Sequence, residues 1–337
     1  MTDDLVAVPG GAGFIGSHLC ARLVADGRQV LALDDFSTGT PANLEALADH
    51  PRLALIRLDI TQASSASLDT ARQIFNLACP ASPAYYQKQP VQTVLASALG
   101  TWRLLEIARC SGARLLQAST SEVYGDPQVH PQHEDYWGHV NPNGERSCYD
   151  EGKRCAEAMC FAYHRQHRVD MRIARLFNCY GPRLRPGDGR VVSNFIVQAL
   201  RGDALTIYGE GLQTRSFCYI DDTVEALVRL MQAPVEVPVN IGNPVEHTVL
   251  DLAEKVLRLT GSRSGLRRMP LPPDDPQRRC PDIGRARSLL GWTPSVSLDD
   301  GLRTTIEHFR HELGLSRPVV SLPSRSAGAW LHHPAPP

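Results

Sequence analysis

The sequence has almost no net charge, no long apolar run and no paired cysteine motif, and each absence narrows what the chain can be. Its 35 basic and 36 acidic residues leave a formal charge of −1, which gives no general attraction to nucleic acid or to an anionic membrane. No apolar stretch approaches the roughly 20 residues of a membrane-spanning helix. We therefore expect neither a nucleic-acid partner nor a membrane partner.

The 9 cysteines form no C-x-x-C pair and lie mostly within apolar runs. This usage is typical of a reducing compartment. The N-terminal residues contain no basic region followed by a long apolar one, so we expect a cytoplasmic protein. No zinc-spaced Cys/His cluster is present, so we interpret His130, His133 and His139 as loop histidines and expect no metal site.

Short apolar segments alternate with helical patterns along most of the chain. Strands are expected at 5–8, 29–33, 53–58, 73–77, 115–119 and 171–176, and helices at 17–27, 90–111 and 149–167. This alternation predicts an α/β fold with a doubly wound parallel sheet, as in Rossmann folds.

The first expected strand and helix are joined by a glycine-rich turn, PGGAGFIG at 9–16. Gly10, Gly13 and Gly16 are spaced three residues apart. Gly11, Gly13 and Gly16 together also satisfy the pattern G-x-G-x-x-G. Such glycines allow a tight turn, let backbone amides approach a pyrophosphate and bring the helix N-terminus close to it. The sequence predicts a dinucleotide site here that includes Phe14 and Ile15.

Acidic residues end the second and third expected strands. Asp34 follows the last motif glycine by 18 residues, and a carboxylate there accepts both ribose hydroxyls and repels a 2′-phosphate, so NAD is favoured over NADP. The alternative is that Asp34 or Asp35 caps the turn. Asp59 either receives the adenine amino group or caps its turn. Ile60 and Ala78 complete the expected cofactor set.

The stretch 115–153 contains the candidate catalytic groups. Tyr149 and Lys153 are an i, i+4 pair on one helical face. Free tyrosine titrates near ~10, and a charge ~4 Å away at an effective dielectric of ~20 is worth roughly 4 kcal/mol, which bounds the lowering of the tyrosine pKa at about three pH units. The pair alone could be an ordinary solvated one. A strand end upstream carries Ser119, Thr120, Ser121 and Glu122, and strand ends are where ligands bind in parallel α/β sheets. These side chains favour a catalytic role for Tyr149 and Lys153.

These residues resemble the extended short-chain dehydrogenases/reductases and, within them, the UDP-glucuronate decarboxylase (UDP-xylose synthase) family. The resemblance covers roughly residues 4–314. It is carried by STSEVYGDP (119–127), EDYWGHVNP (134–142) and CYDEGKR (148–154). It extends through GRVVSNF (189–195), NIGNPVEHT (240–248) and DDPQRRCPDI (274–283).

The resemblance implies an NAD-dependent enzyme that oxidises C4 of UDP-glucuronate, loses carbon dioxide from C5 and returns the hydride to give UDP-xylose. In it, Tyr149 takes the C4 hydroxyl proton and Lys153 holds the nicotinamide ribose and lowers the tyrosine pKa. Thr120 orients the hydroxyl. Glu122 acts with Ser121 on the sugar carboxylate, the ring geometry or water.

The resemblance also assigns residues to the UDP-sugar. Arg279 is implied near the carboxylate and diphosphate, as a candidate for C5 protonation. Arg185, in the basic loop 183–190, has no comparable match. The residues implied to hold the nucleotide sugar are Tyr86, Asn178, Arg190, Asn194, Tyr208, Arg215 and Arg279.

The implied domain division follows the change in composition near residue 181. Residues 1–180, with a return segment at about 217–242, form the NAD-binding Rossmann domain. Residues 181–216 and 243–314 form a smaller C-terminal substrate subdomain, and 315–337, rich in Pro and Ser, form a disordered tail. Helices near 91–111 and 149–167 resemble the pair that makes family members homodimers, although helices packed inside a monomer would look much the same.

Position 121 distinguishes related chemistries. The related 4,6-dehydratases have Thr-Asp-Glu where this chain has Thr120-Ser121-Glu122, and the 4-epimerases lack both acids. One carboxylate favours decarboxylation. A 4-epimerase, a 4,6-dehydratase and a catalytically inactive NAD-binding sensor are the alternatives, and the retained Thr120, Tyr149 and Lys153 argue against the last.

One segment departs from the family pattern. The chain has Leu95-Ala96-Ser97 where the family usually has Lys-Thr-Asn, whose lysine approaches the cofactor and whose asparagine braces backbone near the catalytic helix. A charge-assisted hydrogen bond is worth about 1.5–3 kcal/mol. We therefore expect looser retention of NAD and NADH than is usual for the family, with some escape of a 4-keto pentose.

Overall fold

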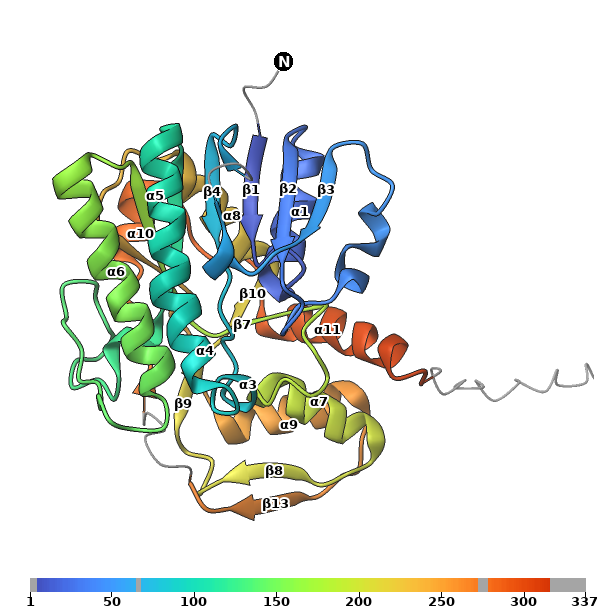
Figure 1. Cartoon of the computed structure of the whole chain (residues 1–337). Helices are drawn as coiled ribbons and strands as arrows, with labels where there is room; N and C mark the ends of the chain where they lie inside the picture. The colour runs from blue at the N-terminus through green and yellow to red at the C-terminus, as the bar shows by residue number, and fades with distance from the viewer. Residues whose placement is uncertain (1–4, 65–67, 272–277, 316–337) are drawn as a thin grey trace, which may run out of the picture.

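The computed structural model describes residues 5–64, 68–271 and 278–315, so the expected tail after Leu315 lies outside the described residues. A parallel sheet of 7 strands forms the centre of the molecule, in the order β11-β6-β5-β4-β1-β2-β3 (Figure 1). The strands are β1 (Leu5–Pro9), β2 (Gln29–Asp34), β3 (Leu53–Arg57), β4 (Gln73–Asn76), β5 (Arg114–Thr120), β6 (Met171–Leu176) and β11 (Pro238–Ile241). The strand order reverses between β1 and β4, where such sheets bind ligands.

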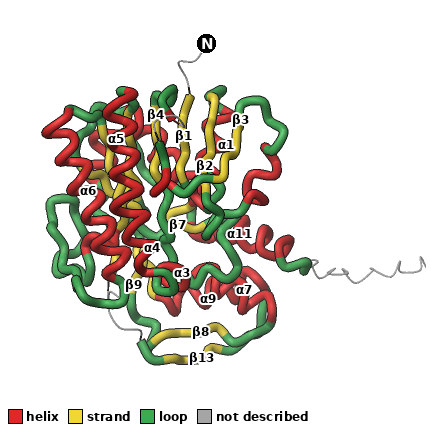
Figure 2. Tube along the Cα trace, viewed as in Figure 1, coloured by secondary structure: helices red, strands yellow, loops and turns green. Residues whose placement is uncertain are grey.

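Alternate residues of β1 enter different hydrophobic cores, because successive strand side chains point to opposite faces. Val6 and Val8 pack with α1 (Phe14–Ala25) and α8 (Ile220–Gln232). Ala7 packs with α5 (Thr101–Ser111) and α6 (Ser147–His167). Helices therefore cover both faces of the sheet (Figure 2), and the predicted doubly wound fold is confirmed.

The helix expected at 90–111 is interrupted. It consists of α4 (Pro90–Leu95), one π-helical turn at Ala96–Gly100 and α5. At Gly100 a Cβ atom would lie 2.3 Å from Ile60 Cδ1, so glycine is needed where the π turn packs on the segment after β3. Such turns are often found at functional sites.

The second region lies below the sheet in Figure 1, where α7, α9, β8 and β13 pack together. The segment that carries β10 and α8 returns from it and leads to β11 at the sheet edge. Its elements, with those that join it to the sheet, are α3 (Pro83–Tyr86), β7 (Cys179–Tyr180), α7 (Val191–Arg201), β8 (Leu205–Tyr208), β9 (Thr214–Ser216), β10 (Cys218–Tyr219), β12 (Glu246–Thr248), α9 (Val249–Thr260), β13 (Leu266–Met269), β14 (Arg278–Arg279), α10 (Gly284–Leu290) and α11 (Leu298–Glu312). In the described part of the chain, 3₁₀ turns occupy Pro41–Leu47, Ile60–Gln62 and Ser121–Tyr124.

Among the described residues, none of the helices combines the length and the apolar character needed to cross a bilayer. The same residues contain no group of three or more His, Cys, Asp and Glu placed to hold a metal ion. All 9 cysteines are free thiols.

Candidate active site

One cavity of about 610 Å³ lies against the carboxyl ends of the central strands, between the sheet and the second region. It brings together every residue that the sequence assigned to the cofactor, the chemistry or the nucleotide sugar. These residues are Gly10, Gly13, Phe14, Ile15, Gly16, Asp34, Asp59, Ile60, Ala78, Tyr86, Thr120, Ser121, Glu122, Tyr149, Lys153, Asn178, Arg190, Asn194, Tyr208, Arg215 and Arg279.

The glycine turn has the shape that a dinucleotide requires. Gly10 has a φ of +80°, and a Cβ on Gly16 would lie 2.0 Å from Gly10 O, so neither position accepts a side chain. Gly13 precedes the first residue of α1, where backbone N–H groups favour a phosphate. Gly11 does not line the cavity and packs on Ala32 of β2 instead. The turn therefore uses Gly10, Gly13 and Gly16, and it fits a pyrophosphate.

Asp34 lines this end of the cavity and also orders its own turn. It accepts hydrogen bonds from the N–H groups of Ala12 (3.0 Å) and Phe36 (2.9 Å), and burial raises its pKa. Both interpretations of Asp34 are compatible with this position. Asp59 accepts from the N–H of Thr61 at 2.8 Å, which confirms its capping role, and adenine binding by Asp59 stays a prediction.

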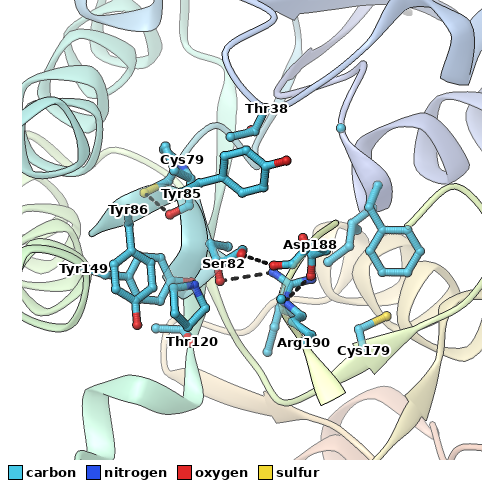
Figure 3. A pocket seen from close by; sticks show the side chains of 18 of the residues that line it. Thr38, Cys79, Ser82, Tyr85, Tyr86, Thr120, Tyr149, Cys179, Asp188 and Arg190 are labelled. Atoms are coloured by element: carbon cyan, nitrogen blue, oxygen red, sulfur yellow. Dashed lines mark hydrogen bonds and ion pairs between the residues drawn. The ribbon is translucent and has the colours of Figure 1, made fainter. Parts of the chain in front are cut away.

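Tyr149 lies in the middle of the cavity wall, on the first turn of α6. Its ring stacks on Tyr86 at 5.1 Å between centroids and 1° between planes, beside Thr120 (Figure 3). Burial, and next the nearby Cys79, raises the pKa of Tyr149, although a hydrogen bond from Thr120 acts in the opposite direction. Thr120 and Tyr149 therefore lie together at the cavity, and their proton exchange with a sugar hydroxyl stays a prediction.

The expectation that Lys153 lowers the Tyr149 pKa stays a prediction, because burial is the larger influence on that pKa in this structure. The Lys153 ammonium donates to Ala118 O at 2.8 Å and lies 5.8 Å from the tyrosine ring centroid. It is thus held by a strand carbonyl over the ring face, and the desolvation of Tyr149 dominates.

Glu122 is the centre of a buried ion-pair cluster. Its Oε2 accepts from Arg279 Nη2 at 2.7 Å and lies 2.9 Å from Arg146 Nη2, while its Oε1 accepts from Arg279 Nη1. Burial alone would raise its pKa, but the guanidinium groups of Arg279 and Arg146 hold the pKa of Glu122 at about 2. Glu122 is therefore a permanent anion near neutral pH and not a proton donor.

Sequence reasoning missed Arg146 and Asp150. Arg146 lies three residues before Tyr149, and this helical spacing was the available signal. Asp150 is 6% exposed, and its Oδ1 has no hydrogen-bond partner. Burial, with Glu122 next, raises the pKa of Asp150 to about 7. A buried titratable carboxyl therefore adjoins Tyr149.

Among the expected nucleotide-sugar residues, Arg190 is held by neighbouring segments of the cavity lining. Arg190 Nη2 donates to Ala81 O at 3.1 Å, and its Nε lies 3.3 Å from Asp188. Ser82 donates to Asp188 O within the same lining (Figure 3). Arg190 is thus already oriented along the cavity.

Comparison with known proteins identifies the family. A family model described as GDP-mannose 4,6 dehydratase matches residues 7–305. The chain is 52% identical to UDP-glucuronic acid decarboxylase 6 of Arabidopsis thaliana over 93% of this chain and 90% of that protein. It is also 52% identical to UDP-glucuronic acid decarboxylase 1 of Danio rerio, over 91% and 73% of the two chains.

The chain belongs to the UDP-glucuronic acid decarboxylase family.

Solved structures confirm the extended short-chain dehydrogenase/reductase fold. The UDP-glucuronic acid 4-epimerase of Bacillus cereus, in complex with UDP-glucuronic acid and NAD, superposes with a TM-score of 0.84 at 30% identity, over 91% of this chain and 99% of that one. The UDP-glucose 4-epimerase of Thermotoga maritima, with UDP-glucose, also has a TM-score of 0.84, at 29% identity over 92% and 99%. The decarboxylases are much closer in sequence than these epimerases.

The departure from the family at 95–97 has a different geometry from the one expected. Leu95 is 38% exposed and does not line the cavity, whereas Ala96 does. The expectation that position 95 approaches the cofactor is therefore wrong, because Leu95 lies on the outer side of α4. Ser97 is 1% exposed, its Oγ is 3.2 Å from Cys79 Sγ, and a Cβ on Gly152 of α6 would lie 3.0 Å from its Cβ. Position 97 does adjoin the catalytic helix.

Proposed function

We propose that the protein is an NAD-dependent enzyme that decarboxylates UDP-glucuronate to UDP-xylose. The observation that carries this proposal is the carboxylate of Glu122, held by Arg279 and Arg146 within the same cavity as Tyr149. A site with one fixed acid and two arginines suits a sugar that itself has a carboxylate. The similarity to decarboxylases at 52% identity supports it.

The chain's own residues fit NAD. The Gly10–Gly16 turn suits the pyrophosphate, Asp34 suits an unphosphorylated ribose, and Lys153 suits the nicotinamide ribose. When bound, NAD accepts the C4 hydride and later returns it, so that the sugar is a 4-ketone while carbon dioxide leaves C5.

Tyr149 moves the proton at the C4 oxygen. It accepts the hydroxyl proton during oxidation and gives it back during reduction, and Thr120 stabilises the intervening anion by its hydrogen bond. Because burial raises the pKa of Tyr149, a cation must come close to the phenol before it can act as the base near neutral pH. Lys153, one helical turn away, is the group we assign to this task.

In this proposal, Glu122 acts through its ion pairs with Arg279 and Arg146, which compete with the substrate carboxylate for the two guanidinium groups. The substrate carboxylate is charged, whereas the carbon dioxide that leaves is neutral. A strong ion pair to the carboxylate therefore stabilises the substrate more than the transition state and would slow decarboxylation. Arg279 already pairs with both Glu122 oxygens, and Arg146 pairs with one. We propose that this competition weakens the hold on the substrate carboxylate while Arg279 still orients it.

The test is the reaction itself. Purified protein with UDP-glucuronate and NAD should release carbon dioxide in a 1:1 ratio with UDP-xylose and without a lasting rise in NADH absorbance. With UDP-glucose, which has a C6 hydroxyl, formation of a 4-keto-6-deoxy sugar would reassign the protein as a dehydratase. With UDP-glucuronate, formation of UDP-galacturonate would reassign it as a 4-epimerase. Binding without turnover would make it an inactive sensor.

We also propose a homodimer in a reducing, cytoplasmic environment. Exposed apolar residues lie together along α4 and the start of α5, namely Val91, Val94, Leu95 and Trp102, and α4 packs against α6. These helices suit the family's paired-helix interface. Light scattering of the wild type and of Val94→Asp should give dimer and monomer, respectively; identical masses would contradict this interface.

A further inference from the structure

Arg185 lines the cavity but has no role in the chemistry proposed above. Its Nη2 donates to Gly39 O at 2.9 Å, and its Nη1 donates to the Tyr85 hydroxyl at 3.4 Å. The guanidinium carbon is 5.9 Å from the Tyr85 ring centroid. One side chain from the loop before α7 therefore contacts two other walls, one after β2 and one after β4.

The Gly39 wall is part of the Asp34 site. A Cβ on Gly39 would lie 2.7 Å from both carboxylate oxygens of Asp34, so this backbone packs directly on the residue expected to hold the adenosine ribose. Burial raises the pKa of Asp34, and the Arg185 charge acts in the opposite direction. The contact with Gly39 therefore fixes the outer side of the ribose site and favours the ionised carboxylate.

The Tyr85 wall continues to the catalytic end. Tyr85 is adjacent to Tyr86, whose ring stacks on Tyr149, and Ser82 of the same segment donates to Asp188 O of the Arg185 loop. Figure 3 shows Tyr85, Ser82 and Asp188 around the same cavity. The Arg185 loop is thus tied to this wall at more than one point, while the Gly39 contact ties it to the cofactor loop.

We propose that Arg185, Tyr85 and the Gly39 carbonyl form a clasp, the 185 clasp, that joins the three walls of the cavity and slows dissociation of the dinucleotide. This inference rests on NAD binding in the proposed function. The effect of the clasp on dissociation is opposite to that expected from the polar groups that positions 95–97 lack relative to the family. Arg185 is therefore a positioning residue for the cofactor. A charge-assisted hydrogen bond corresponds to a factor of about 10–100 in an equilibrium constant.

The test measures NADH release from the full chain without sugar. NADH-loaded protein is mixed with excess NAD, and the decay of bound-NADH fluorescence gives the dissociation rate. Arg185→Gln should raise this rate about 10- to 100-fold, Arg185→Lys less because it keeps the charge but loses the planar fork, and Tyr85→Phe a few-fold. Arg201→Gln, at the exposed end of α7, is the matched control and should release NADH at the wild-type rate.

The outcomes separate the clasp from the reaction. Arg185→Gln should retain kcat at saturating NAD. In this variant the NAD concentration needed for half-maximal rate should rise, and so should the share of 4-keto pentose that is released. An NADH release rate equal to that of Arg201→Gln would overturn the clasp, as would weakened binding of UDP-glucuronate with unchanged NADH release. Faster NADH release in a protein that liberates no carbon dioxide would support the clasp and overturn the decarboxylase.

Discussion

Replacing Glu122 by Gln tests whether the ion-pair cluster is built as described, because the change removes one charge and almost no volume. The Arg279 side chain is 5% exposed and that of Arg146 is 14% exposed. Breaking a buried pair by removing one partner costs about 3–5 kcal/mol, since the remaining charge is left poorly compensated. We expect Glu122→Gln to lower the free energy of unfolding by about 3 kcal/mol, at the low end because the pairs retain some solvent.

The assay is a double-mutant cycle by urea unfolding with Glu122→Gln, Arg279→Gln and both together. Removing Arg279 together with Glu122 relieves the Arg279 charge that Glu122→Gln alone leaves poorly compensated. The double variant should therefore lose little more stability than either single one, with a coupling of roughly 2 kcal/mol. The effect has a pH window. Because Arg279 and Arg146 hold the folded pKa of Glu122 at about 2, below its usual 4.5, the stabilisation is complete above about 4.5 and is lost as pH falls through 2.

The same variant tests the catalytic argument. Without the Glu122 charge, Arg279 should bind the substrate carboxylate more strongly, so kcat should fall at least 100-fold while UDP-glucuronate binds as tightly as before or more tightly. A urea midpoint identical to wild type, or additive losses in the cycle, would refute the buried ion-pair argument. Unchanged turnover would refute the proposal that Glu122 weakens the hold on the carboxylate.

Three further predictions follow from single positions. Tyr149→Phe should abolish turnover while calorimetry shows nearly unchanged NAD binding, and loss of folding would mean that the hydroxyl is structural. Burial raises the folded pKa of Asp150 to about 7 from 3.8, so the stabilisation by its proton is complete below pH 3.8 and is lost as pH rises through 7. Relative to Asp150→Asn, the wild-type free energy of unfolding should therefore fall by up to about 1.4 kcal/mol per pH unit across this range. A difference between the two proteins that stays constant with pH would contradict this prediction. Ser97→Asn should reduce the dependence of activity on added NAD while Leu95→Lys leaves it unchanged, and the reverse order would restore the original expectation for position 95.

The sequence by itself determined the strands of the sheet other than β11, the glycine turn and the placement of Tyr149 and Lys153 on one helical face. These features are local, because strand length, glycine spacing and the i, i+4 relation of Tyr149 and Lys153 depend on short segments of chain. The parallel order then follows from strand–helix alternation. Within the glycine turn, the choice of Gly10 over Gly11 as the first glycine required the tertiary structure, in which Gly11 packs on Ala32.

Tertiary structure alone decided the charges and the ties between walls. Arg279 reaches Glu122 from 157 residues away and Arg185 reaches Gly39 from 146, and no sequence spacing encodes such contacts. The direction of the Tyr149 pKa was decided the same way, because desolvation depends on everything packed around the phenol and the Lys153 ammonium is held by Ala118 O. Leu95 and Ser97, two residues apart, lie on the outer surface and in the interior because α4 and its π turn pack on α6.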